Sequence, residues 1–546
     1  MPQTGAALLV ESLIAAGVKH LFTLSGNQIL SVYDAAIGRD IRLIHTRHEA
    51  AAVHMADACG RLTGQPGVAL LTAGPGHCNA ISALYVALMA ESPVVLLSGH
   101  CPRAQIGLGA FQEMDQVAVA KPVTKAAWLA EDPGRLGQDV AAALRLACAG
   151  RPGPVHLSLP ADVLEATVDE RNRNPLSPPE RSGGFSAAKS KDSFPLSPPD
   201  EALIHEVLSL LADAERPLIL AGPALARPPR WSDVERLSEV TGVPALPMES
   251  PRGVDDPWLH AATNVLSGAD IVLLMGKKLD FSLRFGRPPF FDRSCRFIQI
   301  DADREQAQEG ERIALTVHGD PSDAVQRMAV EAQGRRWREN PWREEVAAMR
   351  RATPPEWEPL RRSSRQPIHP LRVCEALQPF LNDGAILVSD GGEFGQWMQA
   401  GLEAERRLIN GPSGAIGSAL PMGLAAKLTH PQRQVFVVLG DGTFGYHALE
   451  LDTALRYRLP VVAVVGNDAR WNAEHQLQAR NYGPERAVGC GLLPSRYDRV
   501  AEALGGHGEF VQRPDDLAPA LGRAAASGLP ACVNVLIEGA AAPTFR

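Results

Sequence analysis

The fold is decided by residues 440–478, GDGTFGYHALELDTALRYRLPVVAVVGNDARWNAEHQLQ. An apolar strand is predicted just before this stretch, at 434–439, and a second one at 459–465. Residues 446–457 between them have apolar side chains at helical spacing, so a crossover helix is predicted there. Parallel strands joined in this way place Asp441 and Asp468 at one edge of a sheet, where open α/β sheets bind ligands.

The polar residues at these strand ends suit a metal and a phosphate. Asp441 and Asp468 offer oxygen ligands to a hard divalent cation such as Mg²⁺. Gly440, Gly442 and Gly445 allow the backbone to approach a phosphate closely. An ordinary βαβ unit with polar turns is the competing interpretation.

The stretch resembles the thiamine-diphosphate motif, in which GDG is followed by a short helix, a strand and NN. The resemblance implies that Asp441, Asp468 and the backbone carbonyl of Arg470 bind the metal. The second Asn of the motif is Asp468 here, which adds one negative charge near the diphosphate. The cofactor contacts that the motif implies are Gly440, Asp441, Gly442, Thr443, Asp468 and Trp471.

Composition indicates an ordinary globular protein of several domains, with 546 residues, 45% apolar and 21% charged. A net charge of −8 with no basic block argues against a nucleic-acid partner. The eight cysteines are scattered singly, as in a reducing compartment. No secretory signal is evident, and no apolar run reaches the ~18 residues of a membrane helix. We therefore expect a cytoplasmic enzyme without membrane contact.

Short apolar strands alternate with helices in three separate parts of the chain. Such alternation predicts an α/β protein with three doubly wound parallel-sheet domains. A Pro-, Ser- and Gly-rich segment reads as an exposed linker, and a charged, partly helical one as a second linker. The predicted order is domain 1–168, linker 169–199, domain 200–335, linker 336–365, domain 366–535 and C-terminal tail 536–546.

The three domains together resemble the acetolactate-synthase-like group of thiamine-diphosphate enzymes. The resemblance implies that the first domain binds the aminopyrimidine, the third binds the diphosphate, and active sites lie between subunits of a homodimer or homotetramer. Thr46-Arg-His-Glu-Ala-Ala51 matches the motif whose Glu hydrogen-bonds the pyrimidine ring, so Glu49 takes that role. A helix N-terminal acid favoured by the dipole is the alternative for Glu49.

The implied chemistry assigns further residues. Glu49 promotes the imino tautomer, whose nitrogen removes the thiazolium proton when the cofactor is bent. Ile416 supplies the apolar support under the bend, and the carbonyl of Gly414 accepts from the amine. The cofactor is then the electron sink, and the protein orients it. Further cofactor contacts are expected in the segment DGGEFGQW, at Gly392, Glu393 and Phe394.

A substrate-side loop is implied at 109–115, GAFQEMD, with Phe111 and Gln112 reaching the neighbouring active site. Asn27 and Gln28 lie at a strand-to-helix turn that faces the thiazolium in relatives. A polar loop residue without a catalytic role is the alternative for each of them.

The central domain has glycine turns and a terminal acid at its strand ends, at Gly222, Gly276 and Asp301. This is a Rossmann-like layout in which Asp301 would hold a ribose hydroxyl, although a full GxGxxG is missing. The resemblance to CoA-dependent relatives predicts ADP there rather than FAD.

Two positions argue against a true acetolactate synthase: Ser282 replaces the Arg that binds a ketoacid carboxylate, and Leu477 replaces a Trp. The expected activity is cleavage or formation of a 2-hydroxyacyl-CoA from formyl-CoA and an aldehyde or ketone. Oxalyl-CoA decarboxylase, benzaldehyde lyase and acetolactate-synthase-like carboligation are the enzymatic alternatives, and a nucleotide-binding scaffold protein is the non-enzymatic one. Thr544 and Arg546 are expected to close over the substrate, unless the terminus is simply frayed.

Overall fold

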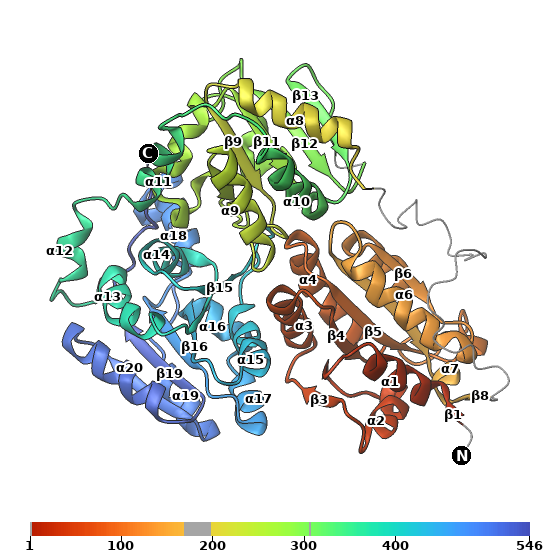
Figure 1. Cartoon of the computed structure of the whole chain (residues 1–546). Coiled ribbons are helices and arrows are strands. Elements are labelled where there is room, and N and C mark those ends of the chain that lie inside the picture. Colours follow the sequence, from red (N-terminus) through yellow and green to blue (C-terminus); the bar gives the residue numbers. More distant parts are fainter. Residues whose placement is uncertain (1–2, 169–197, 305–306, 546) are drawn as a thin grey trace. The chain divides into compact units, whose positions relative to one another are not determined.

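The computed structural model describes residues 3–168, 198–304 and 307–545 (Figure 1). Almost all of the predicted linker 169–199, and Arg546, therefore lie outside the described residues. The chain forms two compact units. The first combines the described part of 1–194 with Leu420–Pro431 and His447–Leu459, and the second holds the remainder. In the parts that the structure describes, no helix is both long and apolar enough to span a membrane.

The first unit contains a parallel six-stranded sheet of order β3-β2-β4-β5-β7-β6. Its central strand β5 is buried along its whole length, as expected for a Val- and Leu-rich parallel strand. Helices follow the strands in alternation (Figure 1). The strands are β1 (Gln3–Thr4), β2 (His20–Thr23), β3 (Arg42–His45), β4 (Gly67–Leu71), β5 (Val94–His100), β6 (Ala126–Leu129), β7 (Pro154–Pro160) and β8 (Thr167–Val168). The helices are α1 (Gly5–Ala15), α2 (Leu30–Ala36), α3 (Glu49–Thr63), α4 (Pro75–Met89), α5 (Gln116–Ala120), α6 (Leu136–Cys148) and α7 (Ala161–Glu165).

The central part of the chain, in the second unit, forms a parallel five-stranded sheet of order β10-β9-β11-β12-β13. Its strands are β9 (Pro217–Ala221), β10 (Ala245–Pro247), β11 (Ile271–Met275), β12 (Arg296–Asp301) and β13 (Ile313–His318). Its helices are α8 (Glu201–Asp213), α9 (Arg230–Thr241) and α10 (Pro321–Ala332), with 3-10 segments η6 (Gly253–Asp255), η7 (Pro257–Gly268) and η8 (Phe281–Gly286).

The C-terminal sheet, also in the second unit, has six parallel strands in the order β15-β14-β16-β17-β19-β18. This repeats the connectivity of the first sheet strand for strand. The strands are β14 (Ile386–Ser389), β15 (Arg406–Ile409), β16 (Val435–Gly440), β17 (Val462–Asn467), β18 (His507–Val511) and β19 (Ala531–Leu536). The helices of this part of the chain are α11 (Trp342–Arg351), α12 (Trp357–Arg361), α13 (Pro370–Leu381), α14 (Gly392–Gly401), α15 (Ala419–Thr429), α16 (Asp441–His447), α17 (Glu450–Tyr457), α18 (Asn472–Tyr482), α19 (Tyr497–Leu504) and α20 (Leu517–Ala526). Three parallel α/β sheets confirm the predicted fold class.

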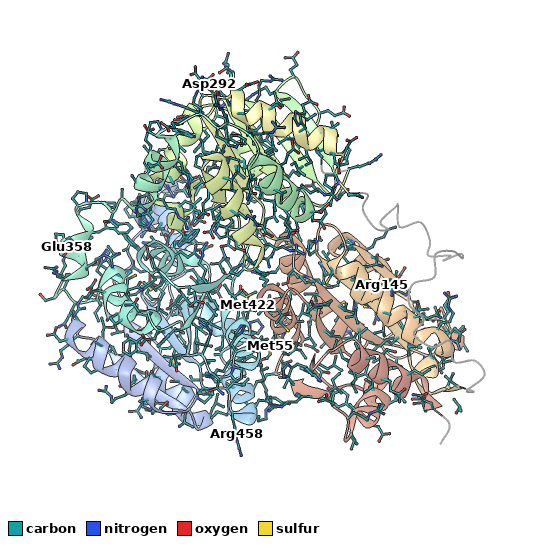
Figure 2. All side chains as sticks on the ribbon, in the orientation of Figure 1. Met55, Arg145, Asp292, Glu358, Met422 and Arg458 are labelled. Atoms are coloured by element: carbon teal, nitrogen blue, oxygen red, sulfur yellow. The ribbon has the colours of Figure 1, made fainter. Side chains whose placement is uncertain are left out.

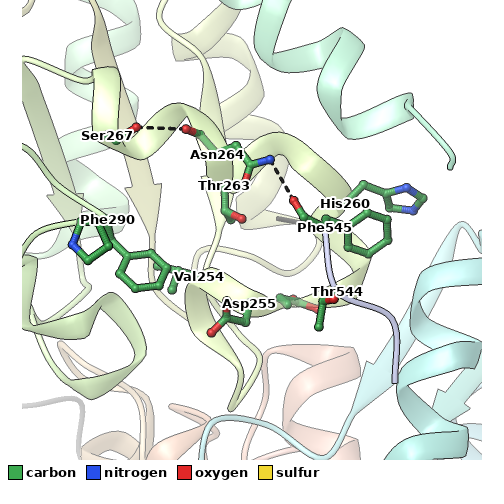
Figure 3. A pocket seen from close by; sticks show the side chains of 11 residues that line it. Val254, Asp255, His260, Thr263, Asn264, Ser267, Phe290, Thr544 and Phe545 are labelled. Carbon is green, nitrogen blue, oxygen red and sulfur yellow. Dashed lines mark hydrogen bonds between the residues drawn. The ribbon is translucent and has the colours of Figure 1, made fainter. Parts of the chain in front are cut away.

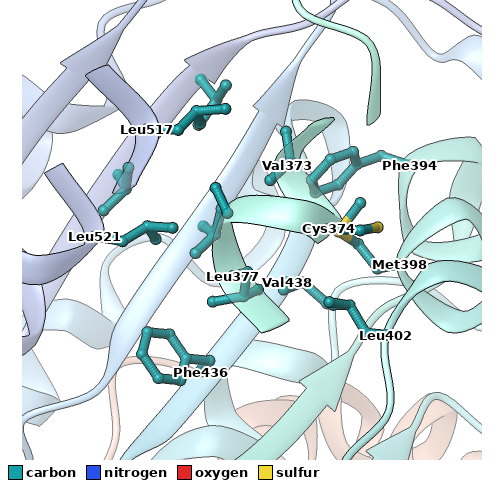
Figure 4. Packing of buried hydrophobic residues seen from close by; sticks show 14 of the residues in the cluster. Val373, Cys374, Leu377, Phe394, Met398, Leu402, Phe436, Val438, Leu517 and Leu521 are labelled. Atoms are coloured by element: carbon teal, nitrogen blue, oxygen red, sulfur yellow. The ribbon is translucent and has the colours of Figure 1, made fainter. Parts of the chain in front are cut away.

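The core of the C-terminal domain packs helices onto the strand that precedes Asp441. Figure 4 shows Leu377 of α13, Met398 of α14 and Leu521 of α20 around Phe436 and Val438 of β16. Burying each such side chain contributes about 1.5–3 kcal/mol. This packing fixes the end of β16, where the predicted ligand site begins. Figure 2 shows the complementary pattern, with Met55 and Met422 inside and Arg145, Asp292 and Glu358 directed outward.

The single helix predicted at 446–457 is in fact two helices. The first, α16, begins at Asp441 and ends at His447, and α17 begins at Glu450. The break leaves Leu449 exposed, whereas Leu451 and Ala454 are buried as expected. The carboxylate of Asp441 is favoured in the first turn of a helix, which explains the earlier start.

The predicted second linker, 336–365, contains helices α11 and α12 and two buried tryptophans. Trp342 donates its indole N–H to the carbonyl of Pro217 at 3.0 Å, and Trp357 joins the core of the C-terminal domain. This charged segment is therefore anchored at both of its helices.

Candidate active site

The carboxyl ends of four strands of the C-terminal sheet meet around a cavity of about 270 Å³. Its walls come from the loops after β14, β15, β16 and β17, the position that open parallel sheets use for ligands. The structure gathers every cofactor and metal residue that was predicted in this domain. They are Gly392, Glu393, Phe394, Gly414, Ile416, Gly440, Asp441, Gly442, Thr443, Asp468, Arg470 and Trp471.

Two buried or partly buried carboxylates, Asp441 and Asp468, line this cavity. Asp441 is the first residue of α16 and is buried, and its Oδ2 has no hydrogen-bond partner among the described residues. Burial, together with the charge of Asp468, raises the pKa of Asp441 to about 7. Burial likewise raises the pKa of Asp468 to about 6. A divalent cation bound by both carboxylates would favour their ionised forms and so offset the cost of burying their charges.

The segment after β17 is held so that the carbonyl of Arg470 is available to a ligand. Ala469 accepts from the N–H of Leu492 at 2.7 Å, and Trp471 donates to Cys490 at 2.8 Å. Because these bonds flank Arg470 in an antiparallel bridge, its own N–H and C=O point away from residues 490–492. The ring of Trp471 packs on Gly442, where an added Cβ would lie 2.6 Å from the indole. A larger residue at position 442 would therefore have to displace this indole.

The loop that carries Gly414 and Ile416 is tied to the end of β14 by a buried acid. Asp390 accepts hydrogen bonds from the backbone N–H groups of Gly391 (2.8 Å), Gly417 (3.1 Å) and Ala419 (3.0 Å). Burial raises the pKa of Asp390, and these three donors oppose that effect. The acid therefore positions the loop rather than the ligand.

Several lining residues escaped the sequence analysis. Ser250, Pro251 and Arg252 reach the cavity from the central domain. The predicted residue Glu393 has a contact that was not predicted, because its Oε2 accepts from the backbone N–H of Ala542 in the C-terminal tail. Asn472 holds the same tail by donating to the carbonyl of Ala540 at 3.2 Å. These contacts join residues that are distant in the sequence, and a single polar residue has no periodic pattern from which such a contact could be predicted.

Glu49 lies in the first unit and begins α3. Its Oε2 accepts from Asn79 Nδ2 at 2.9 Å, and the side chain of His48 caps the helix through the N–H of Ala50 at 3.1 Å. The residues before it are fixed by Glu450, whose Oε1 accepts from the N–H groups of Arg47 (2.9 Å) and His48 (3.1 Å). Neither Asn79 nor Glu450 was predicted. The sequence signal for Glu450 was an acid between the apolar residues Leu449 and Leu451.

The predicted substrate-side residues are brought together only in part. Gln28 donates to Gln112 Oε1 at 3.1 Å and accepts from the Thr72 hydroxyl at 2.7 Å, so these three side chains form one network. Gln112 has a φ of 59°, which is uncommon for a residue other than glycine. Phe111 and Asn27 are exposed and lie outside this network.

Family models identify the chain over most of its length. The N-terminal thiamine pyrophosphate binding domain matches residues 3–119, the central domain of these enzymes matches 204–328, and the C-terminal thiamine pyrophosphate binding domain matches 390–535.

The chain belongs to the thiamine pyrophosphate enzymes.

Its relatives within the family carry out different reactions. It is 34% identical to an acetolactate synthase large subunit of Mycobacterium tuberculosis, covering 97% of this chain and 95% of the relative. It is 33% identical to a 2-hydroxyacyl-CoA lyase 2 of Bos taurus, covering 98% and 90%. It is 31% identical to a 2-hydroxyacyl-CoA lyase of Oryza sativa, covering 98% and 96%. The resemblance to this group is thus confirmed, and a non-enzymatic scaffold protein is not favoured.

The cavity of this thiamine pyrophosphate enzyme fits a diphosphate held by a divalent cation. The unpartnered Oδ2 of Asp441, the raised pKa values of both acids and the close packing of Gly442 at the start of α16 all agree with that ligand. Within the described ranges no cluster of three or more Asp, Glu, His or Cys side chains has metal-binding geometry. The predicted ligand set does not need one, because it has two acids and a backbone carbonyl.

The central domain brings two of its three predicted nucleotide residues together. Gly222 donates to the carbonyl of Met275 at 2.9 Å, and an added Cβ on it would collide with the carbonyl of Gly276. Asp301 ends β12 and accepts from the N–H of Asp303 at 2.9 Å. The close approach of the Gly276 carbonyl alone explains why residue 222 is glycine, so nucleotide binding stays a prediction.

The C-terminal tail lines a second cavity of about 220 Å³, shown in Figure 3. The carbonyl of Phe545 accepts from Asn264 Nδ2 at 2.8 Å, and its ring stacks on His260 with centroids 4.9 Å apart. Thr544 lies beside it in this cavity (Figure 3). The tail is anchored up to Phe545, and its role as a lid stays a prediction.

Proposed function

We propose that this enzyme is a thiamine-diphosphate-dependent carbon–carbon lyase that cleaves a 2-hydroxyacyl-CoA into formyl-CoA and an aldehyde or ketone, and also catalyses the reverse ligation. Ser282 is the observation that carries this choice. It is buried, and both its N–H (3.0 Å) and its hydroxyl (2.7 Å) donate to Asp280 Oδ1. The Arg that the resemblance assigns to acetolactate synthases at this position is absent.

The nearest arginine in the same segment does not compensate. Arg284 forms an ion pair with Asp255, and its guanidinium lies over the ring of Phe290 at 5.4 Å. A free ketoacid carboxylate would therefore lack the bidentate partner that makes such recognition specific. A CoA thioester does not need that partner, and its long nucleotide portion offers binding energy remote from the reacting carbon.

The proposed mechanism assigns a task to each group of residues. When bound, thiamine diphosphate would act as the electron sink of the reaction. Glu49 would hold the proton at the aminopyrimidine ring nitrogen, and Asp441, Asp468 and the Arg470 carbonyl would hold Mg²⁺. Gln28 and Gln112 orient the carbonyl substrate.

Other parts of the proposal go with this activity. Active sites are completed between two copies of the chain, in a homodimer or homotetramer. ADP occupies the strand ends at Gly222, Gly276 and Asp301. The tail, with Thr544 and Arg546, closes over the CoA substrate. A cytoplasmic location stays a prediction.

An acetolactate-synthase-like carboligase is the second candidate. Its support is the 34% identity to the mycobacterial relative over nearly the whole chain. Leu477 argues against it, because the resemblance to acetolactate synthases expects a Trp there.

A substrate panel separates the two. Purified enzyme with thiamine diphosphate and Mg²⁺ is given formyl-CoA with formaldehyde, acetone or benzaldehyde, and separately oxalyl-CoA, pyruvate or benzoin. The proposal predicts 2-hydroxyacyl-CoA as the main product, and no turnover by the Glu49→Gln control. Activity confined to pyruvate or benzoin would reject the CoA lyase and favour the second candidate or a benzaldehyde lyase.

A further inference from the structure

A buried pair of side-chain amides contacts the segment after β17, which carries two of the proposed metal ligands. Asn467 ends β17 and Asn534 lies in the neighbouring strand β19, and these residues are 2% and 0% exposed. Asn467 Nδ2 donates to Asn534 Oδ1 at 3.1 Å and to the carbonyl of Ser495 at 2.9 Å. Asn534 Nδ2 donates to the same carbonyl at 3.0 Å and to Asp498 Oδ1 at 3.2 Å.

The direction of these hydrogen bonds is determined by Asp498. Burial acts to raise the pKa of Asp498, but hydrogen bonds from Arg496 and Asn534 outweigh it and lower that pKa below its usual value. A carboxylate and a backbone carbonyl can only accept, so the NH₂ group of Asn534 must face them and its oxygen must face Asn467. Asn467 donates to that oxygen, and its own Oδ1 therefore faces the N–H of Ala469, from which it accepts at 3.2 Å.

This last hydrogen bond matters because Ala469 has a strained backbone. Its φ is 55°, in the left-handed region that residues with a Cβ rarely adopt. Such a conformation persists only where the surrounding structure holds it. Here the N–H of Ala469 is held by Asn467, and its carbonyl is held by the N–H of Leu492 at 2.7 Å. The next residue is Arg470, which lines the cavity and whose carbonyl is a proposed metal ligand.

We propose that Asn534 is a positioning residue for the metal site. Through Asn467 it keeps Ala469 in the left-handed conformation, and this conformation fixes where the carbonyl of Arg470 lies. The inference rests on the proposed cofactor site. Glycine adopts a positive φ without steric cost, so a glycine at position 469 should make the metal site independent of Asn534.

The test measures the Mg²⁺ requirement, defined as the Mg²⁺ concentration that gives half-maximal binding of thiamine diphosphate to the full chain. In Asn534→Val we expect this requirement to rise about tenfold, the effect of one lost hydrogen bond. Adding Ala469→Gly to that variant should bring the requirement to within about twofold of Ala469→Gly alone. Melting temperatures are recorded as well, and the glycine should not restore the stability that Asn534→Val loses.

Gln299→Leu is the matched control. Gln299 is also a buried side-chain amide on a parallel strand, β12, and it is bonded to the backbone of Gln308 at 2.8 and 3.0 Å. Its replacement should lower the melting temperature and leave the Mg²⁺ requirement unchanged. A rise like that of Asn534→Val would overturn the proposal, because the requirement would then follow stability alone.

A wild-type Mg²⁺ requirement in Asn534→Val would also overturn the proposal, as would a raised one that Ala469→Gly does not lower. If Asn534→Val does not fold, Ala469→Val decides the question, because a β-branched side chain disfavours the left-handed conformation and leaves the buried amides in place. It should raise the requirement at least about tenfold, and a wild-type value would contradict the proposal. Failure of the cofactor site itself looks different, because the wild type would then show no Mg²⁺-dependent binding.

Discussion

Glu450 is predicted to hold the segment that leads into Glu49, and replacing it tests that support. Its side chain is buried, with Oε1 accepting from the N–H groups of Arg47 (2.9 Å) and His48 (3.1 Å). Its Oε2 accepts from the Thr453 hydroxyl at 2.6 Å. In Glu450→Ala both backbone donors lose their acceptor one and two residues before Glu49.

The expected cost follows from these three bonds. Each hydrogen bond to a charged acceptor contributes roughly 1.5–3 kcal/mol, and bonds that share one group are not additive. Burial raises the pKa of Glu450, which shows that keeping its charge inside has a cost of its own. We therefore predict that Glu450→Ala lowers the free energy of unfolding by about 3 kcal/mol. Glu450→Gln keeps one acceptor oxygen and should cost about 1 kcal/mol.

Urea denaturation followed by circular dichroism measures the change, with Asp452→Ala as control. Asp452 lies on the same helix, and its ion pairs with Arg456 (2.8 Å) and with Arg47 (3.9 Å) are partly exposed, so the control should lose less than about 1 kcal/mol. Thiazolium proton exchange should also slow in Glu450→Ala, because Glu49 is no longer held. A Glu450→Ala protein as stable as the control, with wild-type exchange, would refute the reasoning.

Three further predictions concern charge, catalysis and shape. Burial raises the pKa of Asp256 from 3.8 to about 6, so the folded chain binds its proton more tightly than the unfolded chain. That contribution to stability is complete below pH 3.8 and is lost as the pH rises through about 6. Asp256→Asn should hence stabilise the protein by roughly 3 kcal/mol at pH 8 and not at pH 3.5, and an equal effect in urea denaturation at both pH values would contradict this. Glu49→Gln should keep its affinity for thiamine diphosphate but lose exchange of the thiazolium proton, as measured by NMR. Mixed dimers of Glu49→Gln and Asp441→Ala subunits should regain some activity, and inactive mixed dimers would contradict active sites shared between subunits. Gly442→Ala should weaken the binding of thiamine diphosphate at least tenfold in a titration, because the new methyl group would lie 2.6 Å from the Trp471 ring. Wild-type affinity would show that position 442 accommodates a methyl group.

The fold was predictable where the apolar signal was local and strong. β5, β9, β11 and β16 are runs of buried apolar residues that the sequence shows directly. The strands β6 and β18 gave no such signal because they lie at sheet edges and are mostly half-buried. A single helix at 446–457 was a wrong prediction, since apolar spacing does not record the break before Glu450.

The candidate site divides in the same way. Asp441 and Asp468 were found because one strand–helix–strand unit carries both of them. Arg252 and Glu450 contribute to their sites through contacts with segments that are distant in the sequence, and a single polar residue does not reveal such a contact. Their roles become visible from the cavity lining and from hydrogen bonds, which require coordinates.

The most direct test of the account is the Mg²⁺-dependent binding of thiamine diphosphate. The wild type should bind the cofactor in the presence of Mg²⁺ and release it when a chelator is added. The reason is that the carboxylates of Asp441 and Asp468, whose pKa values are raised, offer oxygen ligands to a divalent cation. Asp441→Ala should weaken binding more than about a hundredfold, equivalent to about 3 kcal/mol. Asp468→Asn should stay close to wild type, because an amide oxygen can replace the carboxylate oxygen. If Asp441→Ala binds the cofactor like the wild type while Asp468→Asn does not, the cavity does not hold the metal as described.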